Sequence, residues 1–216
     1  MLEDGIEYVP DYLFYNTDSI KEVVIPDSVT KIGEHAFQQC VSIESFIIPD
    51  SVTVIGEKAF AETTALKSID IPESVQIIHA KAFAGSAISS ISLPEGLPTL
   101  ESEVFADCEN LKKVTVPSTV TSAWNTFSGS YVEEVTFADG MTELPQNVCL
   151  AAKHVSKVNI PDSVTSLGSQ AFSETEALKE FTVPKQITSG AYAFSDSGLD
   201  TVRFEEGTVP PAIRSR

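Results

Sequence analysis

The phrase IPDSVTKIGEHAF, from Ile25 to Phe37, decides the fold of this chain because nearly the same thirteen residues recur twice. IPDSVTVIGEKAF runs from Ile48 to Phe60, and IPDSVTSLGSQAF from Ile160 to Phe172. Prolines and phenylalanines extend this period along the chain in steps of 22 or 23 residues. The prolines are Pro26, Pro49, Pro72, Pro94, Pro117, Pro161 and Pro184, and the phenylalanines are Phe14, Phe37, Phe60, Phe83, Phe105, Phe127, Phe172 and Phe194. Such a period predicts a solenoid, in which each repeat is one coil that buries its apolar side against its neighbours.

One more copy fits into the 45 residues between Phe127 and Phe172, with Cys149 in the place of the phenylalanine and Ala138 in the place of the proline. The segment Glu3–Phe14 aligns as a further copy, in which Pro10 replaces the usual glycine. We therefore expect residues 1–216 to form a single array of about nine coils, with residues 3–207 in repeat register. Residues 208–216 form a tail outside the register, and its last residues, AIRSR, are compatible with a vector-derived origin.

A strand signature precedes the proline of each copy. The segment from Leu66 to Pro72 reads L-x-x-I-x-I-P, and the apolar residues at its first, fourth and sixth places are predicted to point inward. The proline ends the strand because it has no N–H to donate. Val52 and Ile55 then supply a second inward pair before a turn that Gly56 permits, and the Ala-Phe segment closes the coil. Stacked coils place their strands in one parallel sheet with a step of roughly 4.8 Å.

Two coils are one residue short, from Pro117 to Phe127 and from Pro184 to Phe194, and both lack the inward isoleucine. An additional aromatic residue lies near each deletion, Trp124 in one coil and Tyr192 in the other. We expect these two rings to fill the missing volume; the alternative is that they are exposed and bind a partner.

The composition, with 42% hydrophobic and 21% charged residues, is that of a globular chain. The net charge of -17 repels phosphate backbones, so we expect no nucleic-acid partner. No apolar run approaches the roughly 18 residues of a membrane helix, so no membrane insertion is expected. Met1 is followed by LEDG, which is not a signal sequence.

The cysteines and histidines do not form a recognisable chemical site. Cys40 and Cys108 lie three residues after their phenylalanines in coils three steps apart, roughly 14 Å along the stack. That separation exceeds the roughly 7 Å limit for a disulfide, and Cys149 occupies a core position, so three buried free thiols are predicted. His35, His79 and His154 occupy different repeat positions. The acidic residues after each proline lack the glycine-rich nonapeptide of a calcium ladder, and no catalytic or phosphate-binding motif occurs. We therefore expect no metal, no cofactor and no enzymatic activity.

The outward residues of the predicted strands form three columns along the stack. Together they hold 7 Lys or Arg and 7 Asp or Glu residues, so this face is neutral while the rest of the surface carries the full -17. Within the first two columns no like charges are adjacent, which is explained either by stabilisation of the parallel ladder or by a face that a partner can approach. Both explanations remain open. A small-hydroxyl patch, formed by Ser68, Ser89, Ser90 and Ser92, interrupts the alternation of charges, as do the outward Val24 and Ile47. The candidate partner-binding residues are Val24, Ile47, Ser68, Asp70, Ser89, Ser90, Ser92, Lys113, Thr115 and Glu134.

The recurring IP[DE]SV and G-x-x-AF blocks, at a period of 22–23 residues from Glu3 to Gly207, resemble the BspA-type leucine-rich repeat, a class also known from treponemal surface proteins. The resemblance implies a leucine-rich-repeat solenoid of right-handed coils with one parallel β-sheet face, short strands or 3-10 turns elsewhere, and little regular helix. It also implies an exported protein at the cell surface or outside the cell, in a family some of whose members are adhesins.

Two functions from different classes follow. The first is a non-catalytic recognition or adhesion module that binds a host or cell-surface protein, or a glycan, through the sheet face. The second is a structural spacer or an accessory scaffold domain of a larger surface protein or secreted enzyme. Neither end of the array shows a cysteine-rich cap, so end-to-end self-association is also possible.

Overall fold

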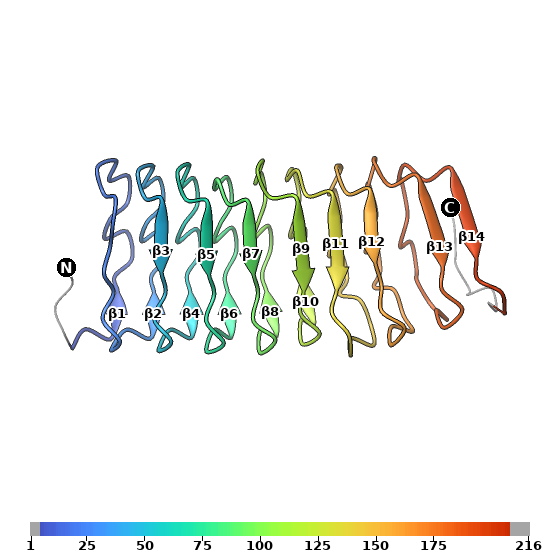
Figure 1. The fold of residues 1–216 in the computed structure, drawn as a ribbon, viewed down its shortest axis with the longest axis horizontal. Coiled ribbons are helices and arrows are strands. Elements are labelled where there is room, and N and C mark those ends of the chain that lie inside the picture. The colour runs from blue at the N-terminus through green and yellow to red at the C-terminus, as the bar shows by residue number, and fades with distance from the viewer. Residues whose placement is uncertain (1–4, 208–216) are drawn as a thin grey trace.

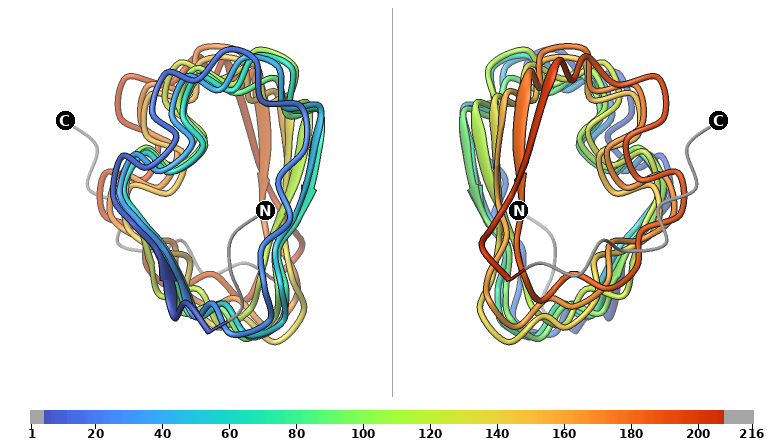
Figure 2. Two further views of the ribbon diagram at one scale, coloured as in Figure 1. Left: turned by 90° about the vertical axis from the view of Figure 1, so that its left-hand side faces the viewer. Right: turned by 90° about the vertical axis from the view of Figure 1, so that its right-hand side faces the viewer.

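The computed structural model describes residues 5–207, which wind into a right-handed parallel β-solenoid of about nine coils (Figure 1). Within these residues there is no helix. Along the long axis the coils superpose on one another, so equivalent residues of successive coils form columns (Figure 2). The tail expected at residues 208–216 lies outside the described residues.

The predicted sheet face is present, and its strands are parallel, but its hydrogen-bonded ladder is divided into three groups. The first group is β3 (Ser45–Ile47), β5 (Ser68–Asp70) and β7 (Ser90–Ser92). The second is β9 (Lys113–Val116), β11 (Glu134–Phe137) and β12 (Lys157–Asn159), and the third is β13 (Glu180–Val183) with β14 (Thr201–Phe204). The predicted strand of the second coil, Lys21–Ile25, has no strand pairing. The sequence predicted the register of this face but not its interruptions.

A second, six-stranded parallel sheet lies on another side of the coil. Its strands are β1 (Tyr8–Val9), β2 (Lys31–Ile32), β4 (Val54–Ile55), β6 (Ile77–Ile78), β8 (Thr99–Leu100) and β10 (Ser122–Ala123). Single bridges continue this sheet from Glu143 to Ser166 and from Ser166 to Ser189. These strands correspond to the T-x-I portion of the repeated phrase, where the isoleucine points into the core.

The third side of each coil consists of turns in which two residues adopt a left-handed backbone. They lie two positions before and two positions after the phenylalanine, as Lys58 and Glu62 do around Phe60 with φ values of 51° and 59°. This conformation turns alternate N–H groups along the solenoid axis. The amides of Lys58, Phe60 and Glu62 each donate to a carbonyl of the next coil, at 3.0, 2.8 and 2.7 Å.

The serine and threonine of the repeated phrase also form hydrogen bonds with the preceding coil. The hydroxyl of Ser51 donates to the Val29 carbonyl at 2.6 Å, and that of Thr53 donates to the Thr30 carbonyl at 3.2 Å. The proline carbonyl accepts the amide of the following valine, from Val52 to Pro49 at 3.0 Å, which closes a turn. The repeated phrase therefore provides hydrogen-bond donors for backbone carbonyl groups as well as apolar side chains for the core.

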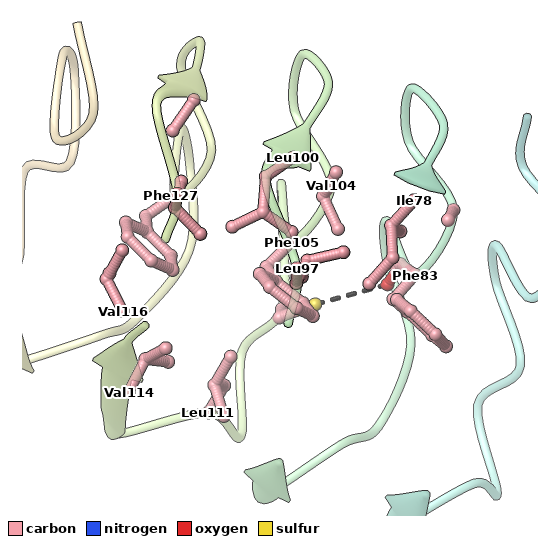
Figure 3. Close-up of a cluster of buried hydrophobic side chains, with 14 of the residues drawn as sticks. Ile78, Phe83, Leu97, Leu100, Val104, Phe105, Leu111, Val114, Val116 and Phe127 are labelled. Carbon is pink, nitrogen blue, oxygen red and sulfur yellow. Dashed lines mark hydrogen bonds between the residues drawn. The ribbon is translucent and has the colours of Figure 1, made fainter. Parts of the chain in front are cut away.

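The core contains a column of stacked phenylalanine rings, three of which appear in Figure 3 as Phe83, Phe105 and Phe127. Centroid distances between successive rings from Phe14 to Phe127 run from 5.3 to 6.1 Å. Cys149 interrupts the column, and stacking resumes between Phe172 and Phe194 at 5.3 Å. The coil of Cys149 contains a buried aromatic residue at another position, Phe137. Its ring contacts that of Phe172 edge-on, with the two centroids 6.2 Å apart. Phe137 thus supplies aromatic volume that Cys149 lacks.

The role predicted for the glycine of the I-G pair is wrong. The backbone of Gly33, Gly56 and Gly168 is not left-handed, so these glycines do not serve a turn of that kind. A Cβ at Gly56 would instead lie 2.6 Å from the carbonyl carbon of Gly33 in the preceding coil. Glycine is required there by the close approach of two backbones.

The expectation that aromatic rings fill the two short coils is also wrong. Trp124 is 50% exposed and Tyr192 is 37% exposed. The inward position belongs to the buried Ala123 in one coil and to the buried Gly190 in the other. Trp124 follows the inward position directly and Tyr192 lies two places past it, so neither ring occupies the missing volume.

Candidate functional site

The candidate partner-binding residues all lie on the sheet face in the predicted columns. Strand pairing aligns Ser45 with Ser68 and Ser90, and Ile47 with Asp70 and Ser92. In the second group it aligns Glu134 with Lys113 and Lys157, and Thr136 with Thr115 and Asn159. Glu134 is partly buried, and the other nine candidates are exposed: Val24, Ile47, Ser68, Asp70, Ser89, Ser90, Ser92, Lys113 and Thr115.

The small-hydroxyl patch lies on β5, β7 and the residue before β7. Ser89 donates both its amide and its hydroxyl to the Lys67 carbonyl, at 2.9 and 3.3 Å. The patch ends at the first interruption of the ladder, because β7 and β9 are not paired. Its side chains are small, and the exposed carboxylate of Asp70 lies beside Ser92 at its edge.

Glu134 is the centre of a charged cluster in the second strand group. Its carboxylate accepts hydrogen bonds from Lys113 at 2.8 Å, from Lys157 at 2.6 Å and from the side-chain amide of Asn159 at 2.8 Å. The bond from Lys113 is the largest of the effects that lower the pKa of Glu134 to about 2, followed by those from Lys157 and Asn159. One carboxylate therefore serves two ammonium groups of neighbouring strands.

Two hollows lie where the ladder is interrupted. The first encloses about 460 Å³ between Lys21–Ile25 and β3, and Val24 and Ile47, 51% and 81% exposed, lie beside it. The second encloses about 420 Å³ between β12 and β13. At the second hollow Val158 and Ile160 are only partly buried, whereas Val135 and Phe137 at the equivalent positions of the preceding coil are buried. The missing strand pairing thus exposes apolar surface.

Sequence reasoning missed an aromatic pair at the edge of the second strand group. The rings of Tyr131 and His154 stack with centroids 4.2 Å apart, and the ammonium of Lys112 lies 4.9 Å from the Tyr131 centroid. The sequence did contain an indication of this pair, because Tyr131 and His154 are large rings at a repeat position that holds small residues in other coils. These are Ser42, Ala65, Ala87 and Ala177.

The three cysteines are free and buried, as predicted. Burial raises the pKa of the Cys108 thiol to about 11 and raises that of Cys149 further. Cys40 and Cys108 donate to the carbonyls of Phe14 and Phe83 at 3.0 and 3.2 Å. Burial thus favours the neutral thiol over the thiolate at all three positions.

Residues 5–207 contain no group of three or more His, Cys, Asp or Glu side chains arranged to hold a metal ion. In the same residues no helix is long and apolar enough to cross a membrane.

The sequence profile of the BspA type leucine-rich repeat region matches residues 7–125 and 123–209 of this chain. No curated protein matches it. A solved leucine-rich repeat protein from Bacteroides ovatus ATCC 8483 has 29% sequence identity and a TM-score of 0.76, and the alignment covers 92% of this chain and 55% of that protein. This chain thus spans about half the length of that relative.

Two further solved structures support the fold alone. The leucine-rich repeat protein of T. pallidum has 23% identity and a TM-score of 0.62, with 79% of this chain and 82% of that chain covered. A leucine-rich repeat protein from Eubacterium ventriosum ATCC 27560 has 17% identity and a TM-score of 0.52, with 76% and 60% covered. From its profile match and its coils, this chain belongs to the family of BspA-type leucine-rich repeat proteins.

Proposed function

We propose that this chain is a non-catalytic recognition module of an exported bacterial surface protein and binds a partner protein through its sheet face. The observation that carries the proposal is the charge distribution. The sheet face holds half of the 14 basic residues and is neutral, although the chain carries a net charge of -17. An acidic partner that approaches this face meets less electrostatic repulsion than it would meet on the acidic flanks.

The ion pairs on the face determine how strong a contact we expect. Lys112 pairs with Glu133 at 3.5 Å, and Arg203 pairs with Glu180 at 2.6 Å, in addition to the pairs of Glu134. Because these charges already have partners, they add little to affinity individually, and we expect a broad contact of modest strength. The resemblance of the repeats to exported adhesins supports a location at the cell surface.

A structural spacer is the second candidate. The same ion pairs connect neighbouring strands, where opposite charges stabilise a ladder by ~0.2–1 kcal/mol per pair. A spacer needs only this stabilisation and has no binding partner on the face.

Label-free binding of the purified chain to extracellular matrix proteins and mucins, at low and physiological salt, distinguishes the two functions. The variant Ser90→Arg places a long charged side chain in the middle of the exposed face, and Gln76→Arg makes the same charge change at an exposed position outside the face. Recognition through the face predicts saturable binding that Ser90→Arg abolishes and Gln76→Arg retains. Absence of binding across the panel, or equal binding by both variants, would favour the spacer.

A further inference from the structure

The stack of Tyr131 on His154 ends beside a small residue. The two rings are nearly parallel, with an interplanar angle of 15° and centroids 4.2 Å apart. In the next coil the same repeat position holds Ala177, whose amide donates to the Lys153 carbonyl at 3.0 Å. The backbone thus joins the two coils at this position. The face of His154 that is turned away from Tyr131 has no aromatic neighbour among residues 5–207.

An ammonium group lies on the other side of Ala177. Lys179 donates to the Glu176 carbonyl at 2.7 Å, and a Cβ at Gly198 in the following coil would lie 2.8 Å from its Nζ. The Lys179 ammonium therefore lies against the next coil. Ala177 itself is partly exposed, and the space above its small side chain is bounded by an imidazole on one side and by an ammonium on the other.

Tyr131 shows which group fits between two such neighbours. Its ring lies between the His154 imidazole, with centroids 4.2 Å apart, and the Lys112 ammonium, 4.9 Å from the ring centroid. Lys112 and Lys179 occupy the same strand column in different coils. The chain thus holds one aromatic ring between an imidazole and an ammonium. It places the same two kinds of group around Ala177, where its own side chain supplies no ring.

The spacing of the coils leaves room for one further ring. Neighbouring coils are roughly 4.8 Å apart, so the groups on either side of Ala177 are separated by two steps, roughly 9.6 Å. Aromatic rings stack with centroids about 4.5 Å or more apart, so one ring fits between them. The hollow of about 420 Å³ between β12 and β13 is lined by Ser156 and Leu178, close to this position, and no strand pairing draws the two coils together there.

We propose that the space above Ala177 is a subsite for an aromatic side chain of the partner protein. The ring stacks on the outer face of His154 and meets the Lys179 ammonium on its other face, where cation and ring attract each other. A saturated ring of the same size gains neither contact. This inference rests on the proposed recognition function, and it names an aromatic side chain, bound at the margin of the sheet face, as the group that the partner supplies.

Two short peptides that differ in one ring test the subsite without the natural partner. They are acetyl-glycyl-phenylalanyl-glycinamide and its analogue with cyclohexylalanine in place of phenylalanine, each titrated into the isotope-labelled chain at pH 7.5 and followed by correlation spectra. The phenylalanine peptide is expected to bind with millimolar affinity, to shift the amides of residues 153–155 and 176–179, and to move the Ala177 methyl resonance upfield through its ring current. The cyclohexylalanine peptide is expected to bind about five-fold more weakly.

Matched variants remove one side of the subsite at a time. His154→Ala is expected to weaken the phenylalanine peptide about five-fold and to leave the cyclohexylalanine peptide unchanged. Lys179→Met keeps the length of the side chain but removes its charge, and it is expected to weaken the phenylalanine peptide about three-fold. Lys67→Met makes the same change at an exposed position of the same strand column, beside the small Ala87, and should have no effect.

A variant that fills the subsite from within tests the same geometry without a probe. Ala177→Phe places a ring next to His154, so it is expected to raise the midpoint of thermal unfolding by about 2–4 °C and to abolish binding of the phenylalanine peptide. Ala65→Phe is the control. Ala65 has the same repeat position between Ser42 and Ala87, so its replacement gains no stacking and should not raise the midpoint.

Several results would overturn the subsite. They are equal binding of the two peptides, binding that His154→Ala leaves unchanged, no shift at any soluble concentration of the phenylalanine peptide, and equal midpoints for Ala177→Phe and Ala65→Phe. Methyl glucoside acting as well as the phenylalanine peptide would indicate a sugar site and contradict the proposal. Because these measurements need no matrix protein or mucin, peptide binding with a silent panel would reject adhesion to the panel while retaining the subsite. Panel binding without peptide shifts would do the reverse.

Discussion

At the scale of single residues, the structure depends on left-handed backbone at positions that the sequence does not mark with glycine. Sixteen residues other than glycine have a positive φ within residues 5–207. They include lysine, glutamate, glutamine and alanine, which have no side-chain preference for this conformation. Hydrogen bonds between coils hold fourteen of them in this conformation, because the amide of every such residue from Tyr12 to Glu174 donates to a carbonyl of the next coil.

Ala151→Gly is expected to stabilise the protein. The φ of Ala151 is 57°, and relief of this backbone strain outweighs the added entropy of the unfolded chain by up to about 1 kcal/mol. Urea unfolding followed by the fluorescence of Trp124, the single tryptophan, measures the change. The adjacent Ala152→Gly is the control. Ala152 is buried and does not have a positive φ, so that variant should lose stability. A loss of stability in both variants would show that the left-handed backbone is not strained at this position.

Replacement of cysteine by serine should separate two classes of buried thiol. Cys149 is fully buried, and among residues 5–207 its side chain has no hydrogen-bond partner, so Cys149→Ser leaves a hydroxyl unsatisfied at a cost of ~1–3 kcal/mol. Cys40 already donates to a carbonyl, and hydroxyl residues such as Thr63 and Thr175 take its repeat position in other coils, so Cys40→Ser should be close to neutral. Denaturation midpoints of the two variants compare them directly. Equal losses would contradict the assignment.

At the scale of elements, the short strands are held by two kinds of contact between coils, close backbone packing and ladders of side chains. Each strand of the six-stranded sheet pairs only two residues, and the backbones of adjacent coils approach closely at the glycines that follow β2 and β4, Gly33 and Gly56. The sheet face has longer strands and adds ion pairs across them.

Gly56→Ala should destabilise the protein because its Cβ would meet the backbone of Gly33 at 2.6 Å, a contact that only a shift of the coil relieves. Overpacking of this kind costs ~1–3 kcal/mol. Gly96→Ala makes the same chemical change where the nearest atom, the Glu73 carbonyl oxygen, is 3.4 Å away, and it should have little effect. Thermal unfolding of both variants tests the contrast. A destabilisation by Gly96→Ala as large as that by Gly56→Ala would show that the backbone approach is not the cause.

Glu134→Gln should reveal a dependence on pH at the acidic end of the scale. The folded protein lowers the pKa of Glu134 from 4.5 to about 2, so the ionised carboxylate contributes stability that is complete above pH 4.5 and is lost as the pH falls to 2. The variant should therefore be less stable than the parent at pH 6 and equal to it near pH 2. Urea unfolding at a series of pH values measures the difference between the two proteins. Glu44→Gln, at an exposed position of the same face, should show no such convergence. A constant difference from pH 6 to pH 2 would contradict the role of the ionised group.

At the scale of the whole molecule, each coil contacts only its two neighbours, so stability accumulates along one axis. Deletion of residues 38–60, which joins Phe37 to Ala61, removes one whole period and restores equivalent contacts. We expect the shortened chain to keep a β-type circular dichroism spectrum and a cooperative transition at a lower temperature. Deletion of residues 38–55 begins at the same residue but breaks the register, and it should abolish the cooperative transition. If both deletions unfold alike, the nearest-neighbour description is wrong.

The sequence alone determined the solenoid, its period, the inward residues of the coils of regular length and the free state of the three cysteines. It did so because stacked coils must present the same packing surface to one another, and this requirement places the same residues at equivalent positions of each repeat. It also predicted the ten candidate residues of the sheet face, because strand alternation assigns outward positions. The tertiary structure alone showed the interruptions of the ladder, the sharing of Glu134 and the outward direction of Trp124 and Tyr192. These features depend on small displacements between coils and on which of several nearby charges meet, and no local pattern of residues encodes either.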